Sequence, residues 1–104
     1  MKLLTKDIIK KLPALYTNEN EPDPLVIAKF FDPCGSWTWY AMEFDGVDTF
    51  FGLVDGFEVE LGNFSLKELE SVRNRFNLGI ERDRYFTPCR LSVVRAKIDA
   101  GREK

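Results

Sequence analysis

The aromatic stretch between Leu25 and Leu61 constrains the fold more than any other part of this 104-residue chain. It holds nine of the fourteen aromatic residues and contains two Asp-Gly pairs, Asp45-Gly46 and Asp55-Gly56. Aromatic and β-branched residues favour strands, and Asp-Gly between two such runs favours a tight hairpin turn. We therefore expect an antiparallel meander over residues 25–61, with strands at 25–31, 36–44, 47–54 and 57–61.

The strand pairing follows by counting if each Asp-Gly pair forms a two-residue type I′ turn. Phe50 then lies opposite Ala41 and Leu61 on the two adjacent strands. One face is expected to carry Trp37, Trp39, Ala41, Phe50, Val54, Phe57, Val59 and Leu61. The other is expected to carry Thr38, Tyr40, Met42, Phe44, Thr49, Phe51, Leu53, Glu58 and Glu60. A one-residue change in loop length would exchange these assignments, because side chains alternate along a strand.

The residues on either side of this stretch are predicted to be helical. Thr5 is a typical N-cap for a helix over residues 6–12, and residues 13–16 are expected to dock as an apolar segment. Ser65 and Glu68 form a capping box, which predicts a helix to about Phe76. Residues 80–86 are expected to be extended or to form a loop.

A last helix is expected to open at Thr87-Pro88 and to carry Leu91, Val94 and Ile98 at helical spacing. The whole chain, residues 1–104, is then one α+β domain. It consists of an N-terminal helix and docking segment (1–16), a four-stranded antiparallel meander (25–61) and C-terminal helices (65–99), so that two or three helices flank the sheet. A helix over the Tyr40 face is the simplest cover for its apolar side chains, and a ligand or partner surface is the alternative.

Composition excludes several kinds of chemistry. Histidine is absent, which removes the usual general base and the commonest zinc ligand. Cys34 and Cys89 make a poor zinc site by themselves, and a disulfide between them is disfavoured in a reducing compartment. No apolar run or leader-like N-terminus suggests a membrane span or secretion, so we expect a cytoplasmic protein with no metal and no cofactor.

Charge is unevenly distributed along the chain. Residues 1–64 sum to −6 and residues 65–104 to +4. The simplest explanation is that the two halves neutralise each other in the fold. A second explanation is that the uneven charge steers a partner.

Two sets of side chains are candidate binding residues. Tyr40 and Phe51 could stack on the bases of a single-stranded nucleic acid, and Arg82 and Arg84 could contact its phosphates. Glu58 and Glu60 belong to an acidic group with Asp45, Asp48 and Asp55. These acids could hold a divalent cation or act as an acid–base pair, but they match no calcium-loop spacing.

Short motifs along most of the chain carry a resemblance to a known family. They are Pro13-Ala14-Leu15-Tyr16, Ala28-Lys29-Phe30-Phe31-Asp32-Pro33, Gly35-Ser36-Trp37-Thr38-Trp39-Tyr40, Glu43-Phe44-Asp45-Gly46, Phe50-Phe51-Gly52-Leu53-Val54, Glu60-Leu61-Gly62, Phe64-Ser65-Leu66 and Ile80-Glu81-Arg82-Asp83. Over roughly residues 13–88 the chain resembles a family of small uncharacterised bacterial proteins, a domain of unknown function carried largely on plasmids, integrating conjugative elements and related genomic islands. An aromatic residue often stands in that family where this chain has Asn63. The resemblance implies a mobile-element context and no activity.

The function we expect is that of a non-enzymatic accessory protein of a mobile genetic element, acting as a protein-binding module. The expected partner is another protein of that element, and the chain itself could be a monomer or a homodimer. Single-stranded nucleic-acid binding through sheet aromatics and arginines is the first alternative. An enzyme that uses acidic residues is the second.

Overall fold

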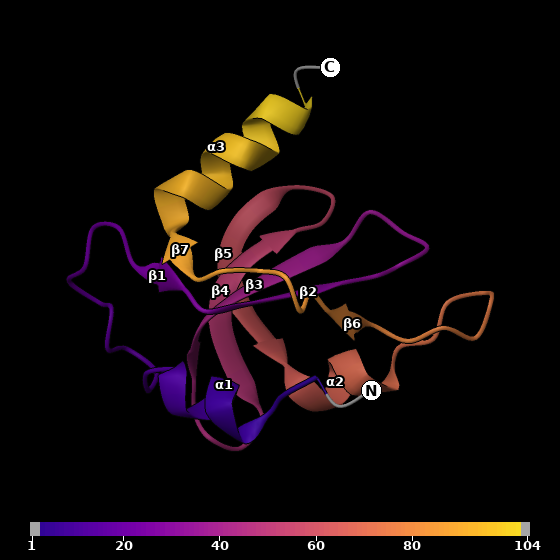
Figure 1. The fold of residues 1–104 in the computed structure, drawn as a ribbon, viewed down its shortest axis with the longest axis horizontal. Helices are drawn as coiled ribbons and strands as arrows, with labels where there is room; N and C mark the ends of the chain where they lie inside the picture. Colours follow the sequence, from indigo (N-terminus) through magenta and orange to yellow (C-terminus); the bar gives the residue numbers. More distant parts are fainter. Residues whose placement is uncertain (1–2, 103–104) are drawn as a thin grey trace.

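The computed structural model describes residues 3–102 as a five-stranded antiparallel sheet with three helices and a small two-stranded sheet (Figure 1). The strands of the large sheet are β2 (Ala28–Phe31), β3 (Thr38–Phe44), β4 (Thr49–Asp55), β5 (Val59–Ser65) and β6 (Glu81–Arg82), in the order β5-β4-β3-β2-β6. The α+β class and the meander order of β2 to β5 are confirmed. The four-strand prediction omitted β6, which pairs with the outer edge of β2.

The first predicted strand, residues 25–31, is divided between the two sheets. β1 (Leu25–Val26) pairs with β7 (Cys89–Arg90), whereas β2 pairs with β3. At the break between them, the Ile27 N–H donates to the Ala41 carbonyl at 2.8 Å. The division brings the chain's C-terminal part beside its N-terminal part.

The first helix forms as its capping residue predicts. α1 spans Lys6–Lys11, and the Thr5 hydroxyl accepts a hydrogen bond from the Ile8 N–H at 3.2 Å. This bond satisfies one of the backbone donors that a helix start leaves unpaired.

The second helix begins where predicted but ends early. α2 spans Leu66–Ser71, and the Ser65 hydroxyl accepts from the Glu68 N–H at 3.2 Å. The expected extension to Phe76 is wrong, because Val72 is extended and the Asn74 side chain accepts hydrogen bonds from two following N–H groups, which stabilises a turn.

The last helix begins later than predicted. α3 spans Leu91–Arg102, whereas Thr87-Pro88 lies before β7 in an irregular segment. Pairing with β1 keeps residues 89–90 extended, and the Asp23 carboxylate accepts from the Ser92 N–H at 2.8 Å and from its hydroxyl at 2.6 Å. A tertiary contact from the loop before β1 therefore sets the start of α3. Within residues 3–102 no helix has the length and apolar composition needed to cross a bilayer.

Both Asp-Gly pairs lie in longer turns than predicted. Four residues separate β3 from β4, and the Asp45 carboxylate accepts from the N–H groups of Val47, Asp48 and Thr49 at 2.8, 2.8 and 3.0 Å. Asp55 pairs with Val59, so three residues form the other turn. The prediction of two-residue turns is therefore wrong at both positions. At the first turn the reason is that the Asp45 side chain stabilises a wider loop by accepting backbone hydrogen bonds.

The longer turns change the register, and with it the side chains on each face. Phe50 pairs with Phe44 and Phe64, not with Ala41 and Leu61. The register also shifts between Ala41 and Glu43, which marks a β-bulge. The predicted faces are therefore wrong for Phe44, which lies on the same face as Phe50, and for the residues of β5. There, Val59 and Leu61 lie with Leu53, and Glu60 lies with Val54.

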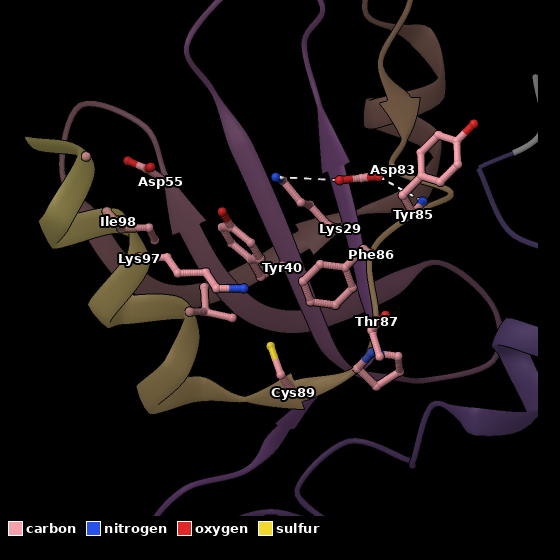
Figure 2. Close-up of a pocket in the computed structure, with 13 residues that line it drawn as sticks. Lys29, Tyr40, Asp55, Asp83, Tyr85, Phe86, Thr87, Cys89, Lys97 and Ile98 are labelled. Carbon is pink, nitrogen blue, oxygen red and sulfur yellow. Dashed lines mark hydrogen bonds and ion pairs between the residues drawn. The ribbon is translucent and has the colours of Figure 1, made fainter.

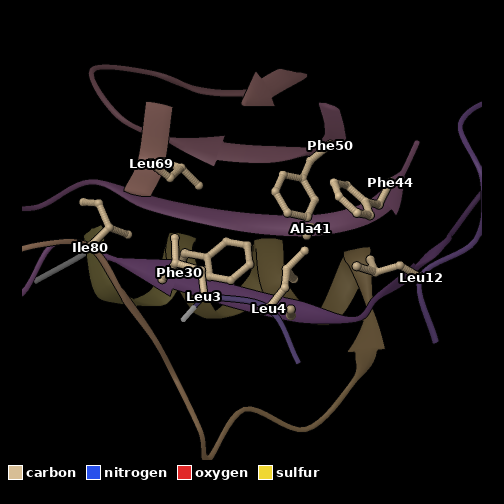
Figure 3. Close-up of a cluster of buried hydrophobic side chains, with 10 residues drawn as sticks. Leu3, Leu4, Leu12, Phe30, Ala41, Phe44, Phe50, Leu69 and Ile80 are labelled. Carbon is tan, nitrogen blue, oxygen red and sulfur yellow. The ribbon is translucent and has the colours of Figure 1, made fainter. Parts of the chain in front are cut away.

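One sheet face carries an aromatic core (Figure 3). Phe50 stacks on Phe44 at 4.6 Å and on Phe64 at 5.1 Å between ring centroids, and Phe30 packs against it at 5.5 Å. The buried members of this cluster are Leu3, Leu4, Leu12, Ala28, Phe30, Ala41, Phe44, Phe50, Leu69 and Ile80. The N-terminal segment, α2 and residue 80 thus cover this face.

The other face, around Tyr40, is covered by α3, which is the first of the two alternatives left open by the sequence. Its buried cluster consists of Val26, Tyr40, Met42, Leu53, Leu91 and Val94. Figure 1 shows α3 at the opposite end of the molecule from α1 and α2. The sheet is therefore a middle layer between two cores.

Two paired glycines provide a test of this packing. A Cβ atom at Gly52 would overlap the Tyr40 carbonyl oxygen, whereas one at Gly62, its partner on β5, would have no atom within 4 Å. We expect Gly52→Ala to lower the free energy of unfolding by about 3 kcal/mol, the upper range for overpacking. Gly62→Ala should change it by less than about 1 kcal/mol. Urea unfolding of both variants checks this, and equal losses would contradict it.

Acid unfolding tests the link between the first hairpin and α2. Asp48 accepts from the Lys67 N–H at 2.8 Å and the Ser65 hydroxyl at 2.7 Å. These bonds hold the pKa of Asp48 below its usual value. Its contribution to stability is therefore full above about pH 4 and is lost as the pH falls through the folded-state pKa.

We expect Asp48→Asn to make stability less dependent on pH below about pH 4. Asp99→Asn, on the exposed side of α3, is the matched control and should unfold in acid as the wild type does. Parallel acid profiles for the wild type and Asp48→Asn would contradict the assignment.

Candidate functional site

An exposed aromatic cluster lies where the β2–β3 connection meets the β4–β5 turn. Trp37 and Trp39 lie 6.0 Å apart between ring centroids, and Phe57 meets the Trp37 ring edge-on at 5.2 Å. Phe57 is 91% exposed, and both tryptophans are half-buried. We call these three residues the aromatic cluster.

Local structure holds the cluster in place. Trp39 packs against the edge of the aromatic core, and the Trp37 ring lies directly against Gly56, where a Cβ atom would overlap it. Phe57 projects from the middle of the three-residue turn. A phenylalanine that stays in water lacks the roughly 2 kcal/mol of stabilisation that burying its side chain would give. A binding surface would explain why such a ring is exposed within an ordered aromatic group.

Acidic side chains border the aromatic cluster. Glu58 follows Phe57 in the turn, and Glu60 lies on the sheet face of Trp39, separated from it by Val54 in one cross-strand row. Residues 43–60 contain six acids and no base. The surface thus combines apolar rings with negative charge.

The structure does not bring the six predicted binding residues together. Tyr40 and Phe51 lie on the face beneath α3, whereas Glu60 and Arg82 lie at the two edges of the opposite face. Glu58 is in the β4–β5 turn, and Arg84 is in the loop after β6. Tyr40 is only 8% exposed and packs on Phe86 at 6.3 Å. The Tyr40 ring therefore offers no open face for stacking.

Arg82 contributes to the fold rather than to an open basic surface. Its guanidinium donates to the Leu3 carbonyl at 2.9 Å, which fastens the N-terminal segment to β6. Arg84 is exposed and lies two residues beyond it. Arg82 and the aromatic residues with which it was predicted to act are therefore on opposite faces of the sheet, whereas Arg84 lies in the loop after β6.

A pocket of about 690 Å³ opens beside Tyr40 (Figure 2). Its floor is β2 and β3, and its walls are residues 83–89 and α3. Lys29 pairs with Asp83 at 3.7 Å, and its ammonium lies 5.9 Å from the centre of the Tyr40 ring. Burial raises the pKa of Tyr40, and the nearby negative charges of Asp55 and Asp83 raise it further. The hydroxyl thus keeps its proton at neutral pH.

A second cavity, of about 380 Å³, lies at Phe51 between the sheet and the loop before β1. Glu43, which is 3% exposed, lines it and accepts from the N–H groups of Tyr16 and Asn18 at 2.9 and 2.8 Å. These bonds satisfy a buried carboxylate and hold the loop against β3. Tyr16 has a positive φ of 69° at this contact. We assign Glu43 a structural role.

The acids considered for a cation or an acid–base pair do not converge. Within the described part of the chain, no three acidic or cysteine side chains come together as a possible metal site. Asp45 and Asp48 instead accept backbone hydrogen bonds, and both cysteines are free thiols.

Sequence reasoning named Tyr40, which lines the pocket, but missed the other residues that define the two candidate sites. Trp37, Trp39 and Phe57 were expected to point inward, because the two-residue turn placed Phe57 in a strand. Lys29, Phe86 and Lys97 line the pocket but come from segments far apart in the sequence. The spacing of residues along the sequence gives no signal for such a pocket. For the aromatic cluster, the correct length of the second turn would have identified Phe57 as a turn residue.

Gly56 provides a test of the aromatic cluster. A methyl group there should displace the Trp37 ring and leave the core intact, because Trp37 lies outside both buried clusters. We expect Gly56→Ala to shift tryptophan emission towards longer wavelength and to change the free energy of unfolding by less than about 1 kcal/mol. Emission identical to that of the wild type would contradict the contact, and Gly101→Ala is the matched control.

Comparison with protein families finds a match over most of the chain. Residues 3–102 match the family described as Protein of unknown function (DUF2958). No curated protein and no solved structure matches the chain. Because the family match covers nearly every residue, the chain belongs to the DUF2958 family.

Proposed function

We propose that this protein is a non-enzymatic protein-binding module whose contact surface is the aromatic cluster. The observation that carries the proposal is the 91% exposed Phe57, which is held in an edge-on contact with Trp37. At protein interfaces a few residues carry most of the binding energy, and aromatic residues such as tryptophan are enriched among them. Rings that are already ordered before binding lose little conformational entropy when a partner binds. The half-buried tryptophans can bury their remaining surface without a change in the fold.

The charge around the cluster favours one kind of partner. Glu58 and Glu60 border the rings, and no base lies between residues 43 and 60. A basic protein surface would pair with these acids, and its lysine or arginine side chains could also lie over the indole faces. Nucleic-acid phosphates would be repelled at this surface, and so would a second copy of the same acidic patch.

The context of the proposal is a bacterial mobile genetic element, with the protein acting in the cytoplasm as an accessory to another protein of that element. The support is the resemblance carried by Gly35-Ser36-Trp37-Thr38-Trp39-Tyr40, a run that contains both tryptophans of the cluster. Mobilisation, integration or plasmid-maintenance genes beside the coding sequence are the expected finding. A neighbourhood of unrelated housekeeping genes would count against this context and leave the binding surface to be tested by itself.

The test compares two exposed aromatic residues in affinity capture from the native host. Phe57→Ser removes the proposed contact, whereas Tyr85→Ser changes a residue that is 95% exposed but lies outside the cluster. Because an interface hot spot contributes at least about 2 kcal/mol, Phe57→Ser should weaken partner binding at least about tenfold. Tyr85→Ser should bind as the wild type does. A partner retained equally by both variants would overturn the assigned surface.

Tryptophan fluorescence then reports on the same site with the purified partner. Trp37 and Trp39 are the only tryptophans in the chain, and both belong to the cluster. Binding there should shift their emission towards shorter wavelength, with an affinity that falls as salt rises. Replacing Glu58 and Glu60 by lysine should slow association, because the rim charge would then repel a basic partner. Binding without any change in emission would contradict the proposal.

A further inference from the structure

We propose that the pocket beside Tyr40, which we call the α3 pocket, binds a small organic anion: a carboxylate or phosphate on a compact apolar body. This site is separate from the aromatic cluster and goes beyond the proposed protein-binding function. At about 690 Å³ the α3 pocket falls within the usual range for small-molecule sites. Three parts of the chain meet around it, namely the sheet, residues 83–89 and α3.

Two lysines and two aspartates line the pocket, and Lys97 is the lysine that is left without an ion pair among the described residues. Lys29 and Asp83 pair at 3.7 Å, and Asp83 also accepts from the Tyr85 N–H at 2.9 Å. Asp55 already has an interaction of its own. Lys97 forms no ion pair with any residue in the range 3–102, and Figure 2 shows its side chain reaching from α3 across the pocket towards Tyr40. An ammonium group held over a pocket in this way is suited to an anionic ligand.

Neutral groups complete an anion site around Lys97. The Tyr40 hydroxyl keeps its proton at neutral pH, because burial and the neighbouring negative charges raise its pKa, so it can donate a hydrogen bond. Thr87 also lines the pocket, but in the view of Figure 2 the Phe86 ring lies between it and Lys97. Phe86, Val94 and Ile98 provide the apolar wall for the body of the ligand. The site thus has the Lys97 ammonium and the Tyr40 hydroxyl beside an apolar surface, an arrangement that can orient an amphiphilic anion.

Four probes with one ring and different head groups test the charge preference. Benzoate, phenyl phosphate, benzyl alcohol and benzylamine are titrated separately into the ¹⁵N-labelled protein. At least one of the two anions should give saturable amide shifts at residues 86, 87, 89 and 94–101, and comparison of benzoate with phenyl phosphate tells which head group the site prefers. Benzyl alcohol should bind at least about tenfold more weakly, because it lacks the charge-assisted hydrogen bond. Benzylamine should bind no better than the alcohol.

Two substitutions separate the proposed contacts from general effects on the fold. Lys97→Met keeps the length and apolar stem of the side chain and should weaken anion binding at least about tenfold. Tyr40→Phe removes only the hydroxyl and should weaken it less. Lys10→Met, on exposed α1, is the matched control and should have no effect. The folded state of each variant is checked by its amide spectrum.

The proposal is overturned by any of three results. Neither anion gives saturable shifts at millimolar concentration, benzylamine binds as tightly as the anions, or Lys97→Met binds as the wild type does. None of these outcomes involves Trp37 or Trp39. Failure of the α3 pocket is therefore distinguishable from failure of the aromatic cluster as a partner surface.

Discussion

The β-bulge at Met42–Glu43 is the feature on which both cores depend. Two residues of β3 there face one residue of β4, and a bulge re-aims the side chains that follow it. Met42 is buried with α3, whereas Phe44 reaches the opposite face and stacks on Phe50 at 4.6 Å. Without the extra residue, Phe44 would lie on the α3 side and the aromatic core would lose a ring.

The same bulge supplies the anchor for the loop before β1. Glu43 points to the α3 side of the sheet, where its carboxylate accepts from the N–H groups of Tyr16 and Asn18. That loop in turn provides Asp23, which binds the first turn of α3 through Ser92. A local irregularity in the central strand is therefore connected, through one loop, to the position of the helix that covers the second face.

Most of the chain is used to cover the two faces of the sheet, and the candidate sites are the surfaces that remain at the edges of the two cores. The N-terminal segment and α2 close one face, and α3 closes the other. The aromatic cluster extends beyond the edge of the first core, at the tip of the β4–β5 turn. The α3 pocket is the space left where α3 meets residues 83–89. Both candidate sites thus lie at the margins of the two cores, where apolar and charged groups meet.

The sequence alone determined the features that depend on neighbouring residues. Thr5 and Ser65 cap their helices, the strand order follows the aromatic runs, and the helical spacing of Leu91 and Val94 predicted the last helix. Only the tertiary structure decided the turn lengths, the bulge, the ends of α2 and α3, and therefore the side chains at each site. The physical reason is that side chains alternate along a strand, so a single added loop residue reverses a face. The contacts that select the loop, such as Asp48 with Lys67, come from residues distant in sequence.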